Sequence, residues 1–193
     1  MKTLVDTSSL VRMAQAYSPF DTKGALNTFL EGRLGEGSLI LLDRVIDEVK
    51  LVSRGAAYEA FPCLRRKECV CRTDGLTPPA PEKFYHMLDN NFVNNSVKRL
   101  KLQGDEIAYR SERNAFLQGA DCMLVVKALN ERNIYGWSNV QILTEESRLN
   151  NDGKLFKKIP SICEQLGITT ISTVEYHRQC SAEIAVEVRL VKG

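Results

Sequence analysis

The chain has 193 residues, and its 26 Lys and Arg against 24 Asp and Glu leave a formal net charge of +2. So small a charge produces no strong field toward nucleic acid or a membrane, and 44% hydrophobic with 26% charged residues indicates a globular chain rather than a disordered one. The longest apolar run, residues 122–126, is far shorter than the roughly 20 residues of a membrane-spanning helix. Asp6 stands where a signal peptide would be apolar. We expect a soluble, cytoplasmic protein with no membrane partner.

Short apolar runs predict strands that are buried on both faces. They cover residues 3–5, 39–42, 140–143 and 168–171, with a weaker fifth strand at 68–72. Segments with helical spacing lie between them, at residues 24–34, 43–52, 121–129 and 160–166. This alternation predicts an α/β fold with a mainly parallel central sheet of four or five strands flanked by helices.

The last residues of the chain change character. Apolar residues alternate with Ala, Glu and Arg over 182–190, which predicts a half-buried strand at the edge of a sheet, either its own or that of a second copy in a homodimer. We therefore expect one domain over residues 1–173 and a C-terminal extension, with this extra strand, over residues 174–193.

Acidic residues fall at the ends of the predicted strands or at neighbouring helix starts. Asp6 ends the first strand, where open α/β sheets place their ligands, although a helix cap is the more common role for such an acid. Helical spacing places Glu48 at the rim of the buried face of its helix and turns Asp47 to solvent. Asp121 opens the most apolar helix.

Thr144, Glu145 and Glu146 directly follow the strand predicted at residues 140–143. Either Glu145 or Glu146 can be the fourth acid of the set, and the spacing leaves that choice open. Clustered carboxylates repel one another, and proteins tolerate them mostly around a divalent cation. Oxygen ligands alone favour Mg²⁺ or Mn²⁺ over zinc.

A structural zinc site is a separate, less favoured possibility. Cys63, Cys69 and Cys71 lie close together with His86 nearby, but the chain contains no C-x-x-C pair. Without a secretion signal, we expect all six cysteines to be reduced thiols.

Five segments together resemble the PIN-domain family. Residues 5–10 (Val-Asp-Thr-Ser-Ser-Leu) resemble its first strand and acid, and 45–49 (Val-Ile-Asp-Glu-Val) resemble the helix with its second acid. Residues 119–125 (Gly-Ala-Asp-Cys-Met-Leu-Val) and 143–146 (Leu-Thr-Glu-Glu) are similar to the third and fourth acid motifs. The segment 157–168 resembles one uncharacterised PIN-like branch, and the resemblance extends over about residues 1–172.

The resemblance implies a three-layer sandwich fold and the activity of a metal-dependent endoribonuclease. Many PIN domains are the toxins of toxin–antitoxin pairs, so the resemblance also suggests that role, with an antitoxin protein as partner. Asp6, Glu48, Asp121 and Glu146 would hold Mg²⁺ or Mn²⁺, and Thr144 would bond a ligand carboxylate or a substrate phosphate. The fourth acid is Glu where most PIN domains have Asp. The chain also has extra residues at about 55–83 and after 172 compared with toxin-type relatives.

The sequence lacks the motifs of several other α/β enzymes. The chain has no glycine-rich dinucleotide fingerprint, no phosphate-binding P-loop and no G-x-S-x-G elbow, and Ser8 stands where an aspartyl-phosphate enzyme would have its second acid. Basic clusters at 98–101 and 154–158 are candidate contacts to an RNA backbone. The remaining alternative is a non-catalytic PIN-like module that binds RNA or protein.

Overall fold

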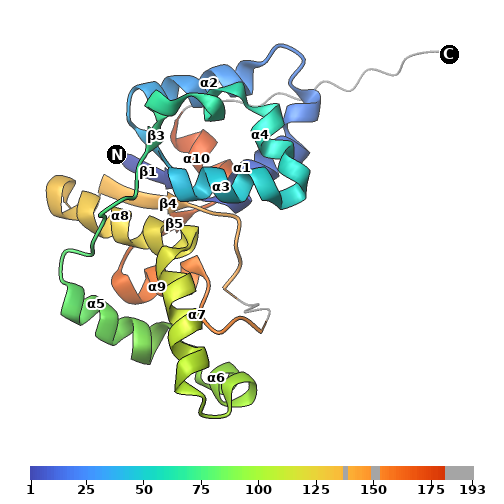
Figure 1. Cartoon of the computed structure of the whole chain (residues 1–193). Coiled ribbons are helices and arrows are strands. Elements are labelled where there is room, and N and C mark those ends of the chain that lie inside the picture. Colours follow the sequence, from blue (N-terminus) through green and yellow to red (C-terminus); the bar gives the residue numbers. More distant parts are fainter. Residues whose placement is uncertain (137–138, 149–152, 181–193) are drawn as a thin grey trace.

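The computed structural model describes residues 1–136, 139–148 and 153–180, and its centre is a parallel β-sheet (Figure 1). The strands are β1 (Lys2–Val5), β2 (Leu39–Leu42), β3 (Val70–Cys71), β4 (Val140–Leu143) and β5 (Thr169–Ile171). They lie in the order β3-β2-β1-β4-β5, and every neighbouring pair is parallel. The predicted α/β class and parallel sheet are therefore confirmed.

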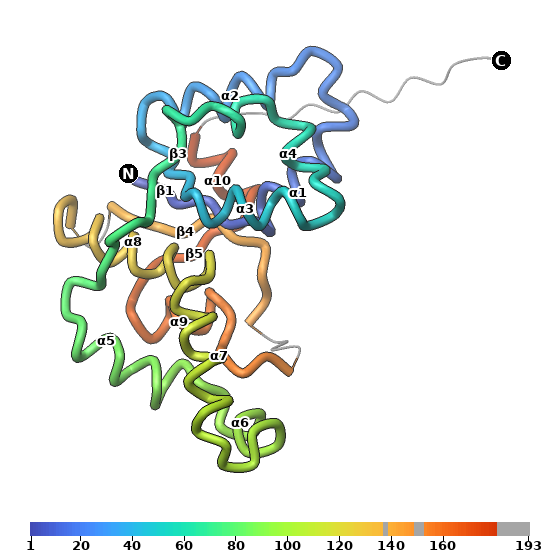
Figure 2. The backbone as a smooth tube through the Cα atoms, in the orientation of Figure 1, coloured from blue at the N-terminus to red at the C-terminus, as the bar shows by residue number. Residues whose placement is uncertain are grey.

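Helices cover both faces of the sheet, which makes a three-layer sandwich. They are α1 (Thr7–Ala16), α2 (Ala25–Gly35), α3 (Asp43–Leu51), α4 (Ala56–Ala60), α5 (Pro81–Met87), α6 (Asn95–Leu102), α7 (Glu106–Gln118), α8 (Ala120–Tyr135), α9 (Ile159–Leu166) and α10 (Thr173–Gln179). Helices α1 to α4 and α10 lie on one side of the sheet, and α5 to α9 lie on the other (Figures 1 and 2). None of the described helices is long and apolar enough to cross a membrane.

The direction of chain travel reverses at the middle of the sheet. From β1 the chain moves to β2 and then β3 on one side, and it returns to β4 and β5 on the other. The point between β1 and β4 is a topological switch point, where the following loops diverge and leave a crevice at the carboxyl ends of the strands. This crevice lies directly after Val5 and Leu143.

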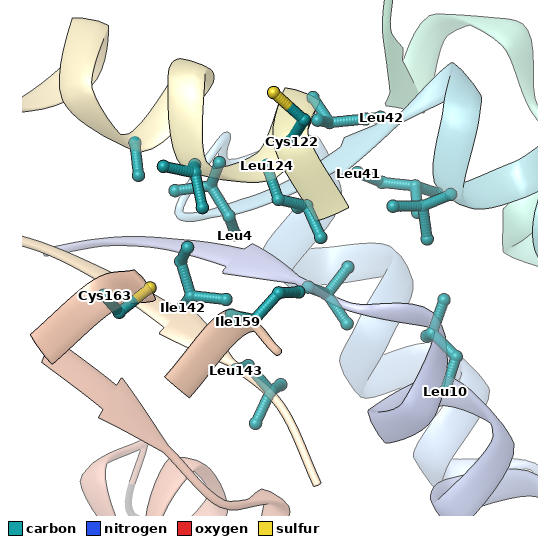
Figure 3. Close-up of a cluster of buried hydrophobic side chains, with 14 of the residues drawn as sticks. Leu4, Leu10, Leu41, Leu42, Cys122, Leu124, Ile142, Leu143, Ile159 and Cys163 are labelled. Carbon is teal, nitrogen blue, oxygen red and sulfur yellow. The ribbon is translucent and has the colours of Figure 1, made fainter. Parts of the chain in front are cut away.

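The core lies against both faces of the two central strands (Figure 3). Leu4, Val5, Ile142 and Leu143 have no exposed surface. Each such side chain contributes about 1.5–3 kcal/mol by burial, so the strands that carry the crevice are firmly held. Continuous apolar runs of this kind are typical of parallel strands covered on both faces.

Helices α5, α6 and α7 form an arm between β3 and α8 (Figure 1). Backbone hydrogen bonds join this arm to the segment before α9: Asn94 N donates to Leu155 O at 2.8 Å, and Lys157 N donates to Phe92 O at 2.8 Å. An antiparallel bridge pairs Val93 with Phe156. The segment that leads to α9 is thereby fixed to the base of the arm.

The expected C-terminal extension, residues 174–193, begins within a helix. Helix α10 begins at Thr173, and Tyr176 and His177 are buried, with the His177 ring 5.3 Å from that of Phe29. Residues 174–179 therefore pack with the domain as a helix. The strand expected at 182–190 lies outside the described residues.

The other expected elements agree closely with the structure. The four main strands are present within one residue of their expected bounds, and the weaker fifth is shorter than expected, with only residues 70–71 paired. The helix expected at 121–129 continues to Tyr135.

Candidate active site

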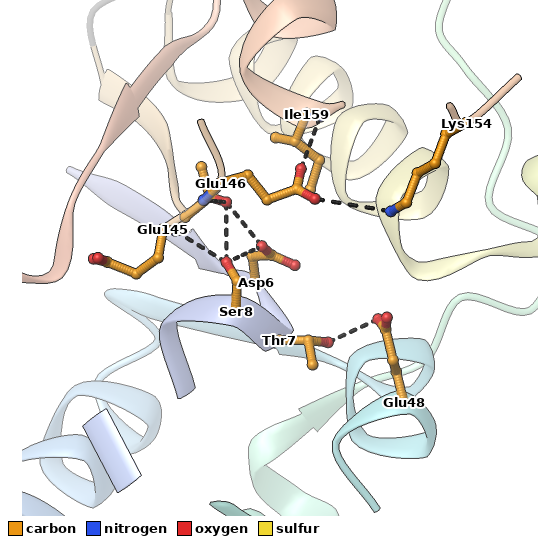
Figure 4. Close-up of polar contacts among 9 residues, drawn as sticks. Asp6, Thr7, Ser8, Glu48, Glu145, Glu146, Lys154 and Ile159 are labelled. Atoms are coloured by element: carbon orange, nitrogen blue, oxygen red, sulfur yellow. Dashed lines mark hydrogen bonds and ion pairs between the residues drawn. The ribbon is translucent and has the colours of Figure 1, made fainter. Parts of the chain in front are cut away.

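Asp6 lies at the switch point, at the carboxyl end of β1 (Figure 4). It occupies the N-cap position of α1, but its carboxylate makes no capping hydrogen bond. Instead Oδ2 accepts hydrogen bonds from Ser8 Oγ at 2.5 Å and Thr144 Oγ1 at 2.8 Å. Only 3% of Asp6 is exposed, and this burial raises its pKa although the two hydroxyls oppose the shift. One hydrogen bond therefore joins Asp6 to the first turn of its own helix, through Ser8, and the other joins it to Thr144 at the end of the neighbouring strand β4.

The same two hydroxyls bind the loop after β4. Glu145 N donates to Ser8 Oγ at 3.0 Å, and Glu146 N donates to Thr144 Oγ1 at 3.1 Å. The ends of β1 and β4 are thus connected through side-chain oxygens as well as through the sheet. This network fixes the direction in which both acids of the loop leave the backbone.

The structure separates Glu145 from Glu146, which the sequence leaves open. Glu145 Oε1 accepts hydrogen bonds from Thr173 N at 2.7 Å and Thr173 Oγ1 at 2.5 Å, so it binds the start of α10 and points away from Asp6 (Figure 4). Glu146 extends to the other side, where Oε2 accepts from Ile159 N at 3.2 Å. Burial and then the charge of Asp6 raise the pKa of Glu146. Glu146 is therefore the acid that shares the site.

Helix α3 brings Glu48 to the opposite side of the crevice. Glu48 Oε2 accepts a hydrogen bond from Thr7 Oγ1 at 2.8 Å, across the start of α1 (Figure 4). Asp47 points to solvent, with 66% of its side chain exposed and Lys50 Nζ at 3.5 Å. The orientation of these two acids agrees with the helical spacing of Val45 and Val49, which are fully buried on the inner face.

Asp121 comes from the first turn of α8, on the face of the sheet opposite to α3. Burial, and then the charges of Asp6 and Glu146, raise its pKa to about 7; Lys154 opposes this shift, and Glu48 adds a smaller effect in the same direction as the other acids. Within the described residues its carboxyl group accepts no hydrogen bond. All four acids are therefore near enough to interact through their charges, although they come from four different elements.

The chemistry of this set fits a hard divalent cation. Each of the four acids offers carboxylate oxygens, and a bound cation would offset both the burial and the mutual repulsion that raise the pKa of Asp121. As the side chains stand, however, the described residues contain no group of three or more His, Cys, Asp and Glu arranged as a ready set of metal ligands. Glu48 and Glu146 instead engage Thr7 and Ile159.

The cysteine cluster likewise forms no set of metal ligands among the described residues. All six cysteines are free, with Cys63 buried and Cys69 and Cys71 partly exposed. Burial raises the pKa of the Cys63 thiol to about 11, so it is protonated at neutral pH. No zinc set formed by these residues with His86 is present in the part of the chain that the structure describes.

Three residues at the site have roles that the sequence did not assign. Ser8 and Thr7 each hold an acid, and the only signal for this in the sequence is a run of small polar residues directly after a strand-end acid. Lys154 Nζ lies 4.0 Å from Glu146 Oε1, beside the acids rather than on a remote basic face. No local pattern identifies Lys154, because its position depends on the path of the loop before α9.

Fold and site together define a doubly wound α/β protein with four carboxylates around its switch point. A family model described as a domain of unknown function, DUF4411, matches residues 66–184, more than half of the chain. The chain belongs to this family. The match includes Asp121, Thr144 and Glu146 but begins after Asp6 and Glu48. Comparisons with curated proteins and with solved structures found no match.

Proposed function

We propose that this protein is a metal-dependent endoribonuclease of the PIN type. The observation that carries the proposal is the meeting of Asp6, Glu48, Asp121 and Glu146 at the switch point, where their charges act on one another. A purely structural role does not explain four acids there, because like charges brought together without a cation destabilise the fold. The order of the acids along the elements and the parallel sandwich support the same assignment.

Each residue has a definite part in this proposal. The four acids would hold Mg²⁺ or Mn²⁺, which when bound supplies a water of lowered pKa and positive charge opposite the phosphodiester. Thr144 and Ser8 keep the Asp6 carboxylate in one orientation through its Oδ2. Thr7 does the same for Glu48. These hydroxyls are positioning groups rather than reacting ones.

The test is RNA cleavage by the purified full chain. We expect single-stranded or structured RNA to be cut in Mn²⁺ or Mg²⁺, and EDTA to abolish the cleavage. Asp6→Asn keeps the shape of the side chain but removes its charge, and should lower the rate by at least about 100-fold. Asp47→Asn is the matched control, because Asp47 is exposed and outside the crevice. Cleavage that persists in EDTA, or that Asp6→Asn leaves unchanged, would contradict the proposal.

The second candidate is a PIN-like module that binds RNA or protein without cleaving. Its supporting observation is that the acids do not form a ready set of metal ligands among the described residues. Binding of RNA without any cleavage in Mn²⁺ or Mg²⁺ would favour this module over the nuclease. A role as the toxin of a toxin–antitoxin pair is a more specific form of the nuclease proposal. Its test is whether expression of the protein arrests cell growth, and whether co-expression of a small neighbouring gene restores growth.

A further inference from the structure

A pocket of about 450 Å³ opens beside Asp121, on the side of the acids that faces the arm. Its walls come from α6, α7, the start of α8 and the segment 154–157. The backbone bonds between residues 92–94 and 155–157 hold these walls together. The pocket is therefore a fixed part of the fold, continuous with the acidic crevice through Asp121.

The two basic clusters of the sequence come together at this pocket. Lys101 lines it from α6, and Lys154 and Lys157 line it from the segment before α9. Lys154 Nζ also lies 4.0 Å from Glu146 Oε1 (Figure 4), so this lysine both lines the pocket and contacts an acid of the crevice. Lys98 faces elsewhere, with its Nζ 3.5 Å from the centre of the Tyr109 ring. The three lysines of the lining outnumber its two acids, Glu112 and Asp121, and they lie where a strand leaving the acidic crevice would pass.

The remaining walls are mostly apolar and aromatic. Phe116 and Phe156 are stacked with their centroids 4.3 Å apart, Leu102, Ala115 and Leu155 add apolar surface, and Glu112 adds one carboxylate. Phe156 is buried, whereas Phe116 is partly exposed and has a surface toward the pocket. A phosphate backbone alone gains nothing from such walls, but an unpaired base does, because its faces are apolar and stack on aromatic rings.

We propose that this pocket binds one unpaired nucleotide of a single-stranded RNA, next to the phosphodiester that lies at the acids. The lysines bind the flanking phosphates, and the base enters against Phe116. This inference rests on the proposed function for the direction of the strand, but the binding itself requires no cleavage. A base paired within a duplex cannot enter, so the pocket selects single strands over duplexes.

The test is RNA binding by the full chain in the Asp6→Asn background with EDTA, measured by fluorescence anisotropy. The probes are a labelled single-stranded RNA of mixed sequence and the same RNA annealed to its complement. We expect the single strand to bind at least about tenfold more tightly than the duplex. Equal affinity for the two, or no binding of either, would overturn the proposal.

Two further variants locate the binding. Ala115 is exposed and lines the pocket, so Ala115→Trp fills it while all four acids of the crevice are kept, whereas Asn114→Trp places the same indole outside the pocket. Lys101→Gln combined with Lys157→Gln removes two lining charges, and Lys23→Gln combined with Lys67→Gln removes two exposed charges elsewhere. Circular dichroism and melting temperature establish that each variant is folded.

We expect Ala115→Trp and the double variant at the pocket to weaken single-strand binding about tenfold, and the two controls to bind as the parent does. The pocket double variant should also reduce the slope of log affinity against log salt by about 1.4, since each phosphate that the protein no longer neutralises lowers that slope by about 0.7. Unchanged binding by Ala115→Trp would overturn the proposal even if the protein cleaves RNA. Pocket-dependent binding without cleavage in Mn²⁺ would sustain it while the nuclease assignment fails.

Discussion

Asp121 differs from the other three acids because, among the described residues, no hydrogen-bond donor reaches its carboxyl group. Burial and the neighbouring carboxylates raise its pKa from 3.8 to about 7. In the unfolded chain the group ionises near pH 4, whereas in the folded chain it keeps its proton until about pH 7. The folded state therefore loses stability as the pH rises through this window, and the loss is complete above pH 7.

Replacing Asp121 by Asn removes that penalty, so Asp121→Asn should stabilise the metal-free protein at pH 8, by up to roughly 4 kcal/mol for a shift of about three pKa units. Below pH 4 the variant and the parent should unfold alike, since both side chains are then neutral. Urea unfolding in EDTA at pH 4 and pH 8 measures the difference. If Asp121→Asn were less stable than the parent at pH 8, the ionised Asp121 carboxylate would carry no penalty from burial and from the neighbouring acids.

The position of Asp6 could be predicted because a strand-end acid needs only the strand to be recognised. Its partners could not. Thr144 is 138 residues away from Asp6 in sequence, and no local pattern shows that the two share a hydrogen bond. The choice between Glu145 and Glu146 likewise depends on Thr173, which attracts Glu145 to the start of α10.

Helix α3 carries two adjacent acids, Glu48 at the crevice and Asp47 in solvent. Substitutions of the two therefore form a matched pair of variants. Glu48→Gln should lower RNA cleavage about 100-fold, because it removes a negative charge from the crevice while keeping the size of the side chain. Asp47→Asn should leave the rate within about twofold, since Asp47 faces solvent beside Lys50 and surface substitutions have small effects. Initial rates in Mn²⁺ with equal amounts of folded protein provide the comparison.

Equal loss of activity in both variants would mean that α3 is rotated relative to the crevice. Thr7→Val separates the effect of position from that of charge, because Glu48 keeps its charge but loses the hydroxyl that holds it.

The central strands were predictable from the sequence, and helices α6 and α7 of the arm were not. Strands β2 and β4 are continuous apolar runs because both of their faces are covered, and such runs are visible in the sequence. Helix α6 buries none of its residues, and α7 buries only Tyr109, so the arm has too weak an apolar stripe to be recognised. The pocket depends on this arm, which is why the basic clusters could be found in the sequence but the cavity between them could not.

At the scale of the molecule, a bound cation would join elements from both sides of the sheet. Mn²⁺ or Mg²⁺ that binds the folded chain alone stabilises it in proportion to the logarithm of its concentration, by about 2.7 kcal/mol at one hundred times the dissociation constant. For a chain of this length we expect the melting temperature to rise by about 5–10 °C. Differential scanning fluorimetry over a metal titration, with Ca²⁺ and K⁺ as comparisons, measures the rise.

Asp6→Asn should abolish most of that increase, whereas Asp47→Asn should keep it. A melting temperature that does not respond to either metal in the parent protein would mean that the acids hold no divalent cation under these conditions.

The pairing of β1 with β4 also has a consequence for how the protein is made. Asp6 is synthesised well before the hydroxyl that holds it, because that hydroxyl belongs to Thr144, 138 residues later in the chain. A parallel pair so distant in sequence closes late, because the chain must bring together ends that are separated by a long loop. On a translating ribosome the set of four carboxylates stays incomplete until β4 and the Glu146 that follows it have been synthesised. Under the proposed function, the nascent chain cannot cut its own messenger RNA until that point in translation.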